Sequence, residues 1–277
     1  MKSVIPIRSF FGILMLLVII PSLKGQDDSR RDYVPEVGQQ GKDVVWVPTP
    51  QELVDTMLSI AELTPSDLVI DLGSGDGRTV ITAAKRGARA IGIEFNPDMV
   101  TLSRRNAEKE GVSSQVQFFE GDLFEYDLSK ATVITMFLLP EINLKLRPRL
   151  LELKPGTRVV SNTFTMGEWI PDLEVNTPDS WNSWTTALMW IIPAKVEGRW
   201  KIGEHELSLT QKYQFINGTF NNGGTITAIA DGRLRGNEIS FKIGNIIYLG
   251  QVNGSRITGT AKSDSAKWDW TAVKSSE

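Results

Sequence analysis

The sequence of 277 residues contains no cysteine and a single histidine, His205. Without cysteine the chain forms no disulfide and offers no thiolate as a metal ligand or nucleophile. One histidine leaves little material for a zinc site or for a triad built on an imidazole. We therefore expect no metal site, and the lack of cysteine leaves the cellular compartment open.

An excess of charge of one sign is also missing. The sequence has 30 Lys and Arg residues and 33 Asp and Glu residues, for a formal net charge of −3. Proteins that bind nucleic acid usually carry a clustered basic face. The charge balance therefore argues against a nucleic-acid partner, and the hydrophobic content of 41% is typical of a globular protein.

Long apolar runs are absent apart from one near the N-terminus. Lys2 and Arg8 precede the apolar run 10–20, and polar residues follow it. This pattern predicts a signal peptide over residues 1–25, with cleavage after Gly25. The alternative is an uncleaved membrane anchor, although the run is short for a span of about 20 residues. The protein is then exported or membrane-associated, and an anchor that leaves the chain facing the cytosol is the alternative.

The chain is organised around residues 68–78, where an apolar run ends in Asp71 and enters a loop with Gly73, Gly75 and Gly77. A helix-like run follows the loop. This pattern predicts a strand, a tight turn and a helix, the first βα unit of a nucleotide-binding α/β fold. Glycines let the backbone approach a ligand closely, and the first N–H groups of the helix point at whatever lies over the loop.

The loop differs from two other ligand-binding loops. The dinucleotide fingerprint needs its third glycine where this chain has Arg78, and the Gly-Lys-Ser/Thr of a Walker loop is absent. The run from Asp71 to Gly77 resembles motif I of the class I S-adenosylmethionine (SAM) methyltransferases. The resemblance implies SAM as cofactor, a Rossmann-like doubly wound seven-stranded sheet, and a loop around the methionine part of SAM. The alternative is a glycine-rich turn in another doubly wound sheet.

Two further acids follow predicted strands. Residues 88–95 predict the second strand, and Glu94 lies about 20 residues after the glycine loop. A carboxylate there accepts hydrogen bonds from both ribose hydroxyls of a nucleoside, and a solvated loop acid is the alternative. After the third strand, 116–120, the resemblance implies that Asp122 meets the adenine amino group and that Leu123 frames the ring.

The cofactor-binding residues implied by the resemblance all lie at the ends of the first three predicted strands. They are Asp71, Gly73, Ser74, Gly75, Gly77, Glu94, Phe95, Asn96, Asp122 and Leu123. The sequence identifies no general base, for which Glu141 and Glu168 are weak candidates.

The fourth predicted strand, 131–137, runs into Leu138-Leu139-Pro140. Methyltransferases that act on the amines of DNA or glutamine carry Asn/Asp-Pro-Pro-aromatic here, so this apolar stretch argues against nucleobase methylation. A lysine acceptor must lose a proton, and an apolar pocket lowers its pKa by desolvation. Four apolar side chains are candidates to line such a pocket, although core packing is the commoner role: Met136, Phe137, Trp169 and Trp184.

Flanking motifs narrow the resemblance to the lysine methyltransferases of the mitochondrial ATP synthase c-subunit and adenine nucleotide translocase. The match covers roughly residues 44–192 and rests on four runs: 47–50, 71–78, 94–97 and 164–172. It implies a protein-lysine substrate, with membrane proteins as the substrates of that family. The stretch 137–140 departs from what the mitochondrial enzymes carry, which leaves the substrate class open.

Two helix starts are predicted from local signals. Thr49 is expected to be the N-cap of a helix that begins at Pro50, with Glu52 completing a capping box. Asn96 followed by Pro97 predicts a second N-cap.

From about Lys195 the pattern changes to short strand-like runs separated by Gly, Asn and Asp. Residues 206–215 predict one of these strands. Residues 232–239 and 250–257 share Gly-x-Leu/Val-x-Gly-x-x-Ile, and each predicts a strand, a tight turn and a strand. We expect a small antiparallel barrel or sandwich of about six to eight strands that binds a substrate or partner. Binding of a lipid, or a cap on the edge of the sheet, is the alternative role. The domains are then 1–25 signal peptide or anchor, 26–43 linker, 44–194 methyltransferase domain and 195–277 β-rich domain.

Three functions remain open. The chain is a SAM-dependent methyltransferase for a protein lysine, one for a small-molecule or lipid-like acceptor, or an exported binding protein that kept the fold without the activity. The joint presence of Asp71, the glycines, Glu94 and Asp122 argues against lost activity. Export of the domain, however, conflicts with the synthesis of SAM in the cytosol.

Overall fold

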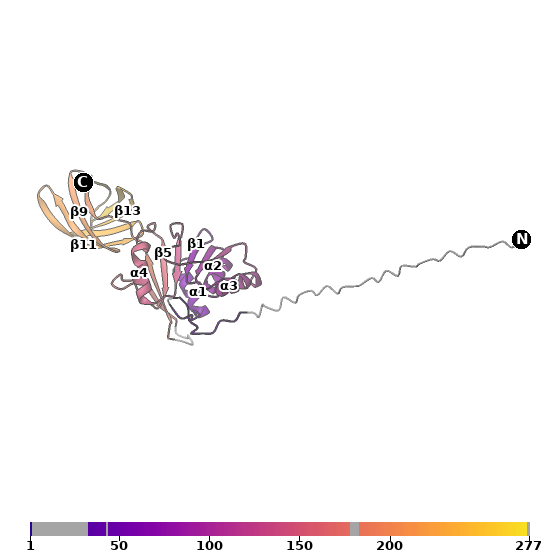
Figure 1. Cartoon of the computed structure of the whole chain (residues 1–277). Helices are drawn as coiled ribbons and strands as arrows, with labels where there is room; N and C mark the ends of the chain where they lie inside the picture. The colour runs from indigo at the N-terminus through magenta and orange to yellow at the C-terminus, as the bar shows by residue number, and fades with distance from the viewer. Residues whose placement is uncertain (2–32, 43, 178–182, 276–277) are drawn as a thin grey trace. The chain divides into compact units, whose positions relative to one another are not determined.

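The computed structural model describes residues 1, 33–42, 44–177 and 183–275. The predicted signal peptide, apart from Met1, and the first part of the predicted linker lie outside the described residues. The chain divides into two units, Met1–Val34 and Pro35–Glu277, and the second holds the helices and strands (Figure 1). Among the described residues, no helix is both long enough and apolar enough to span a bilayer.

Seven strands form one mixed sheet in the order β3-β2-β1-β4-β5-β7-β6. The first five run parallel, and β7 runs antiparallel to both of its neighbours. The strand order reverses between β1 and β4, and open α/β sheets bind ligands at such a switch point. The strands are β1 (Leu68–Leu72), β2 (Arg89–Glu94), β3 (Val116–Glu120), β4 (Val133–Met136), β5 (Arg158–Asn162), β6 (Leu173–Asn176) and β7 (Thr186–Ile191).

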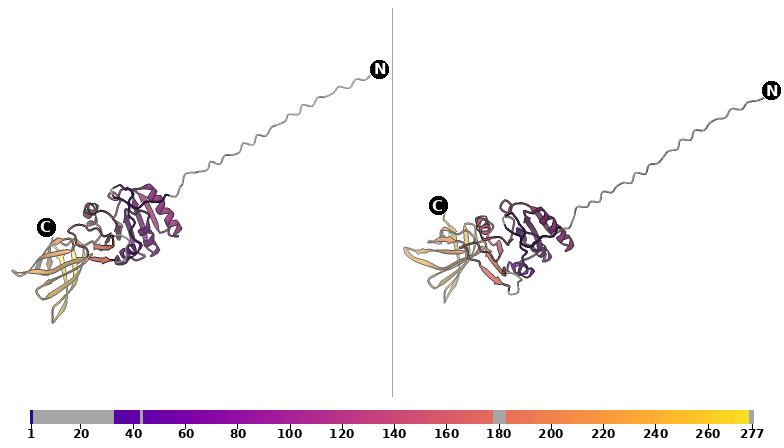
Figure 2. Two further views of the ribbon diagram at one scale, coloured as in Figure 1. Left: turned by 90° about the horizontal axis from the view of Figure 1, so that it is seen from below. Right: turned by 60° about the horizontal axis from the view of Figure 1, so that its bottom comes forward.

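Helices cover both faces of this sheet (Figures 1 and 2). Buried side chains of α1 (Gln51–Ile60), α2 (Arg78–Lys85) and α3 (Pro97–Lys109) pack with one face of the sheet. Those of α4 (Pro140–Leu150) pack with the other face. Strand β4 is buried along its whole length, and three of its four residues are apolar, as expected of a strand covered on both faces. The predicted doubly wound seven-stranded sheet is confirmed.

Eight antiparallel strands after the sheet close into a barrel, ordered β10-β11-β12-β13-β14-β15-β8-β9. Buried aromatic rings fill it, and Phe241 stacks on Tyr248 with centroids 5.0 Å apart. Closure leaves no free sheet edge, which decides between the barrel and the sandwich. The strands are β8 (Gly198–Ile202), β9 (His205–Lys212), β10 (Phe215–Asn222), β11 (Thr225–Arg235), β12 (Glu238–Ile243), β13 (Ile246–Asn253), β14 (Arg256–Lys262) and β15 (Lys267–Lys274).

Several local predictions are confirmed. The repeats at 232–239 and 250–257 form the hairpins β11–β12 and β13–β14, which turn at Gly236 and Gly254 with φ near +60°. Asn96 caps α3, since its side chain accepts a hydrogen bond from the Asp98 N–H at 2.9 Å.

Two local predictions are wrong. The chain turns at Tyr213, whose φ is +55°, so residues 206–215 belong to the hairpin of β9 and β10 and not to one strand. Within the part of the chain that the structure describes, no side chain caps α1. The Oγ1 atom of Thr49 instead accepts a hydrogen bond from Asn162 Nδ2 at 3.3 Å. Tertiary contacts override the local signal in both cases.

Candidate functional site

The loop between β1 and α2 uses its glycines for a tight backbone path. Gly73, Gly75 and Gly77 have φ values of +75°, +54° and +83°. A Cβ at Gly75 would lie 2.6 Å from Nε1 of Trp46, and one at Gly77 would lie 2.9 Å from the Phe118 ring. Side chains at these two positions would therefore displace the aromatic groups packed against the loop.

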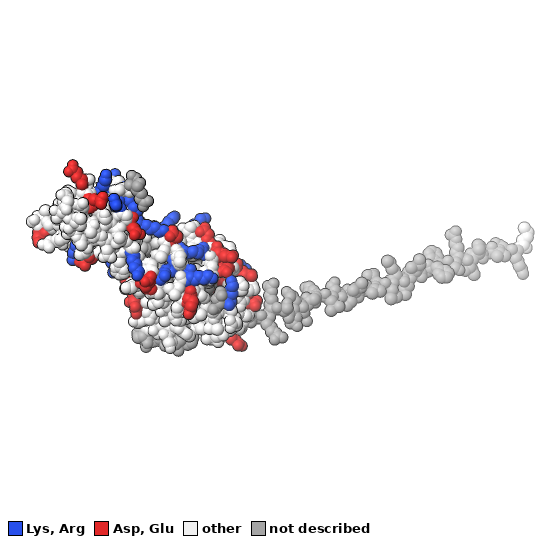
Figure 3. All heavy atoms as spheres, turned by 60° about the vertical axis from the view of Figure 1, so that its left-hand side comes forward, with Lys and Arg blue, Asp and Glu red and all other residues white. Residues whose placement is uncertain are grey.

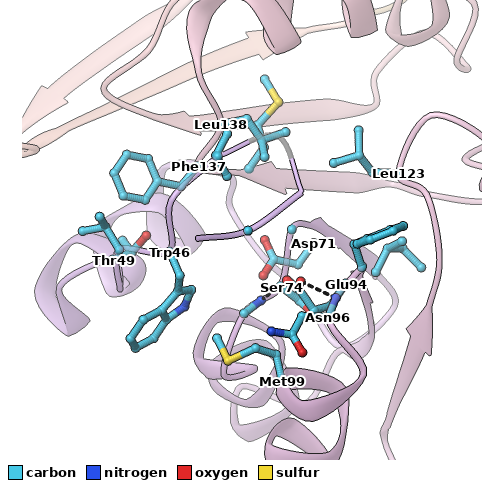
Figure 4. A pocket seen from close by; sticks show the side chains of 18 of the residues that line it. Trp46, Thr49, Asp71, Ser74, Glu94, Asn96, Met99, Leu123, Phe137 and Leu138 are labelled. Atoms are coloured by element: carbon cyan, nitrogen blue, oxygen red, sulfur yellow. Dashed lines mark hydrogen bonds between the residues drawn. The ribbon is translucent and has the colours of Figure 1, made fainter. Parts of the chain in front are cut away.

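The carboxylate of Glu94, at the end of β2, is held by this loop and by its own following turn. Its Oε2 atom accepts a hydrogen bond from the Gly75 N–H and its Oε1 atom one from the Asn96 N–H, both at 2.9 Å (Figure 4). Each carboxylate oxygen can accept a second bond. The group is thus oriented to receive two hydroxyls.

Asp71, in β1, carries a perturbed carboxyl group. It is 6% exposed, and Oγ1 of Thr135 in β4 donates a hydrogen bond to it at 2.6 Å. The pKa of Asp71 is raised to about 7, mainly by burial; the Thr135 hydrogen bond opposes the shift, and the nearby charges of Glu94 and Asp76 add to it. A ligand cation at this place stabilises the ionised form.

Asp122, after β3, is held in its charged form by a lysine that sequence reasoning left in the linker. The Nζ of Lys42 lies 2.7 Å from Oδ2 of Asp122, and the Phe124 N–H donates to Oδ1 at 2.8 Å. The hydrogen bond from Lys42 is the main reason that the Asp122 pKa lies below its ordinary value.

The segment that carries Lys42 covers part of the site. The Gly38 N–H donates to the Trp46 carbonyl and the Trp46 N–H to the Gln39 carbonyl, so the chain doubles back on itself. Lys42 and Trp46 both line the same cavity as the glycine loop. The segment therefore belongs structurally to the site, beyond the linker role expected for residues 26–43.

One cavity of about 380 Å³ unites these groups. Gly77 does not line it and serves as the N-cap residue of α2. In Figure 4, Leu123 and Phe137 lie on opposite sides of Asp71. Nine of the ten predicted cofactor-binding residues line this cavity: Asp71, Gly73, Ser74, Gly75, Glu94, Phe95, Asn96, Asp122 and Leu123.

The predicted acceptor residues divide into two groups. Met136, Phe137 and Trp184 line the cavity. Trp169 does not: it is fully buried and stacks on Tyr213 with ring centroids 5.7 Å apart. Trp169 therefore has the core-packing role that was the commoner expectation, because Tyr213 of the barrel covers it.

The two weak candidates for a general base lie elsewhere. Glu168 is bonded to Lys212 and Tyr213 of the barrel. Glu141 is exposed on α4 and is not part of the cavity wall.

Sequence reasoning missed many wall residues, among them Lys42, Trp46, Thr49 and Phe164. Of these four, three precede motif I and one follows β5, so no periodic pattern connects them to the glycine loop. The apolar run Val44-Val45-Trp46-Val47 was the available signal, because a tryptophan is seldom left in solvent.

The chemistry of the cavity fits SAM. SAM carries a ribose diol, an adenine amino group and an amino-acid ammonium beside its sulfonium. The cavity offers the carboxylates of Glu94, Asp122 and Asp71 at three separate places. The Oγ atom of Ser74, also in the wall, is buried without a hydrogen-bond partner among the described residues. A ligand that brings donors would complete this set.

Comparison with known proteins agrees with this chemistry. A family model, the ANTKMT methyltransferase domain, matches residues 71–173. A protein-lysine N-methyltransferase from Saccharolobus islandicus is 43% identical over 163 residues, which are 58% of this chain and 96% of that protein. The human lysine N-methyltransferase of the ATP synthase c-subunit is 36% identical over 128 residues, 46% of this chain and 54% of that protein. This chain thus spans about half the length of the human relative.

A solved structure is similar over the same part of the chain. The crystal structure of an RNA methyltransferase from Salinibacter ruber in complex with S-adenosyl-L-homocysteine has 50% sequence identity and a TM-score of 0.51. The match covers 54% of this chain and 96% of that chain. The matched part of the Salinibacter ruber structure and that of the Saccharolobus islandicus enzyme are each close in length to the sheet domain.

Proposed function

We propose that this chain, which belongs to the family of SAM-dependent methyltransferases with the ANTKMT-type domain, methylates a lysine side chain of a protein. The observation that carries the choice of lysine is the acceptor side of the cavity. There the wall consists of Met136, Phe137, Leu138, Phe164 and Trp184. Such a wall suits a flexible alkyl amine, because it packs against the methylene chain and desolvates the nitrogen.

The residues that would hold SAM follow from the wall. Glu94 would bind the ribose hydroxyls, Asp122 and Leu123 the adenine, and Asp71 with the glycine loop the methionine part. When bound, SAM supplies a methyl group on a positively charged sulfur that leaves as a neutral thioether. These roles stay predictions.

The contribution of the protein is to prepare and align the amine. The lysine nitrogen must be neutral to form the new bond to carbon while the sulfur–carbon bond breaks, and it then releases its extra proton. Lysine arrives as an ammonium and gives its first proton to solvent, and the apolar wall then keeps water away from the neutral amine. Alignment of the two reacting atoms accounts for much of the acceleration in a displacement of this kind.

The printed name of the Salinibacter relative raises RNA as the alternative acceptor. Two observations favour protein. The stretch Phe137-Leu138-Leu139 has no side chain that holds a planar amine by hydrogen bonds. On the face drawn in Figure 3, Lys and Arg side chains of the described residues lie interspersed with Asp and Glu side chains, where RNA binding would favour a basic patch.

The test is methyl transfer by the full chain from radiolabelled SAM into a cell lysate. We expect label in protein that survives ribonuclease and is lost when lysines are acetylated beforehand. Peptide mass spectrometry then finds lysines heavier by methyl groups. Label that ribonuclease removes, or that stays in the small-molecule fraction, contradicts the protein-lysine assignment.

The N-terminal segment bears on where this reaction takes place. From the apolar run 10–20 and the basic residues before it, we propose that residues 1–25 target the chain for export or to a membrane. Fractionation of cells that express the full chain, followed by N-terminal sequencing, tests this assignment.

A further inference from the structure

Three aromatic rings from separate parts of the sheet domain meet in the cavity wall. Phe137 follows β4, Phe164 follows β5, and Trp184 precedes β7. The rings of Phe137 and Phe164 lie 6.0 Å apart and nearly parallel, at 17°. The rings of Phe137 and Trp184 lie 5.7 Å apart at 64°. We refer to these three residues as the aromatic wall.

A strained turn positions Phe164. Thr163 has a φ of +58°, which a β-branched residue rarely adopts. The Phe164 N–H donates to the Asn162 carbonyl at 2.6 Å, so the three residues form a γ-turn of the strained kind. Strain of this type persists where the surroundings over-determine it, and it gathers at functional sites.

The surroundings do over-determine this turn. The carbonyl of Phe164 accepts hydrogen bonds from Asn143 Nδ2 at 3.0 Å and from Ser161 Oγ at 2.8 Å. Asn143 and Ser161 are both fully buried. The Thr163 N–H donates to the Thr186 carbonyl at 2.7 Å. Groups from α4, β5 and β7 thus converge on one loop and hold one ring in the cavity.

We propose that the aromatic wall is the acceptor subsite and that it selects an alkyl ammonium group by cation–π attraction. The proposal rests on the proposed function, because it names the surface that receives the lysine. Ring faces attract an alkylated ammonium and contact its methylene chain. They offer no hydrogen bond to the edge of a nucleobase, so the wall also discriminates against planar amines.

The first experiment uses choline and its neutral isostere, in which carbon replaces nitrogen, as probes of the full chain saturated with S-adenosylhomocysteine. The probes have one shape and differ in charge. We expect choline to bind at least about fivefold more tightly, and Phe164→Leu or Phe137→Leu to remove most of this difference. Equal binding of the two probes to the unsubstituted chain overturns the proposal.

The second experiment measures methyl transfer by the same variants. We expect Phe164→Leu to raise the KM for the acceptor about tenfold and to leave the Kd for SAM within about twofold. The matched control is Phe215→Leu, an aromatic position of the barrel that contacts Arg233 and lies outside the cavity wall. Its KM should be unchanged. A changed Kd for SAM with an unchanged acceptor KM would assign the rings to the cofactor site and overturn the proposal.

Thr163→Gly keeps the test decisive if the leucine variants fold poorly. Glycine adopts the positive φ without strain, which offsets the loss of the hydrogen bond from the Thr163 hydroxyl to Asn162 Oδ1, so this variant should fold. Its Phe164 is less restrained, so the acceptor KM should rise while the Kd for SAM stays constant. A folded variant with an unchanged acceptor KM overturns the positioning role.

The experiments separate the two proposals. If choline discrimination depends on Phe164 but no lysine is methylated, the subsite stands and the acceptor is another alkyl amine. If lysines are methylated with an unchanged KM in Phe164→Leu, the proposed function stands and the subsite is wrong.

Discussion

The Glu94 carboxylate accepts a hydrogen bond from the Gly75 N–H at 2.9 Å, so the acid that ends β2 fixes the loop that follows β1. Glu94→Ala should therefore weaken SAM binding by roughly 1–3 kcal/mol, because it removes a charged acceptor of hydroxyls and releases the loop. Calorimetric titration of SAM into the full chain measures this change. Glu94→Gln keeps one acceptor oxygen, so its affinity for SAM should lie between that of the unsubstituted chain and that of Glu94→Ala. An unchanged affinity in Glu94→Ala would show that the ribose assignment is wrong.

Asp71 should make the stability of the ligand-free protein depend on pH. Burial raises its pKa in the folded state to about 7, above the ordinary value of 3.8. Between these values the folded chain holds a proton that the unfolded chain has lost. The free energy of unfolding therefore falls as pH rises from about 4 to about 7, by up to about 4 kcal/mol. Urea unfolding at pH 5 and pH 8 measures the loss, and Asp71→Asn should reduce it.

The same carboxyl group should make SAM binding depend on pH. A ligand ammonium beside Asp71 favours the ionised carboxylate, so binding below the pKa must release a proton. The affinity for SAM should then rise with pH between about 5.5 and 7, by up to about tenfold per pH unit. Titrations in two buffers of different ionisation enthalpy detect the released proton. An affinity that is flat across this range would contradict contact between Asp71 and a cation.

Gly75 and Gly111 provide a matched pair of glycines with positive φ, at +54° and +70°. A Cβ at Gly75 meets Trp46 at 2.6 Å, whereas one at Gly111 meets no atom within 4 Å. Both alanine variants should lose about 1 kcal/mol of stability from the backbone conformation alone. Gly75→Ala should lose more and should bind SAM at least about tenfold more weakly, because Trp46 must move. Equal stability and equal SAM affinity would contradict a close contact of Trp46 with the loop.

Tyr213 should couple the barrel to the sheet domain, while its neighbour Lys212 should not. The Tyr213 ring stacks on Trp169, and its hydroxyl lies 2.9 Å from Glu168 Oε1. Lys212 contacts the same glutamate through an exposed ion pair. Tyr213→Ala should cost about 1–2 kcal/mol and split the calorimetric unfolding into two transitions. Lys212→Ala should change little, because exposed ion pairs contribute little. One transition in both variants would contradict the coupling.

The strands of the sheet were predictable because the runs that form them are apolar and end in glycines or acids. The strand at 116–120 was bounded correctly on this basis, and β1 ends one residue after the predicted end of its apolar run at Asp71. The carboxyl ends of parallel strands meet at one edge, so Asp71, Glu94 and Asp122 were expected to lie together, and they line one cavity. The tight turn after β1 was also predictable, because alternate glycines that follow a strand are typical of such a turn.

Most of the remaining wall residues had no local sequence signal that pointed to the cavity. Lys42 and Trp46 reach the cavity through a backbone reversal, and Phe164 reaches it through the strained turn at Thr163. Trp169 has the same apolar character as Trp184, but the barrel covers the first and leaves the second in the cavity wall. The spacing of apolar residues indicates which face of a helix or strand is apolar, but it does not indicate which other element packs against that face.

By itself the sequence determined the doubly wound sheet, the glycine loop with its three acids, and a β-rich C-terminal domain. These depend on local patterns of apolar residues, glycines and turns, which act over a few residues. The tertiary structure alone decided that the barrel closes, that Lys42 pairs with Asp122, and that Phe137, Phe164 and Trp184 meet. Those contacts join residues distant in the chain, and packing and burial select them only after the elements have assembled.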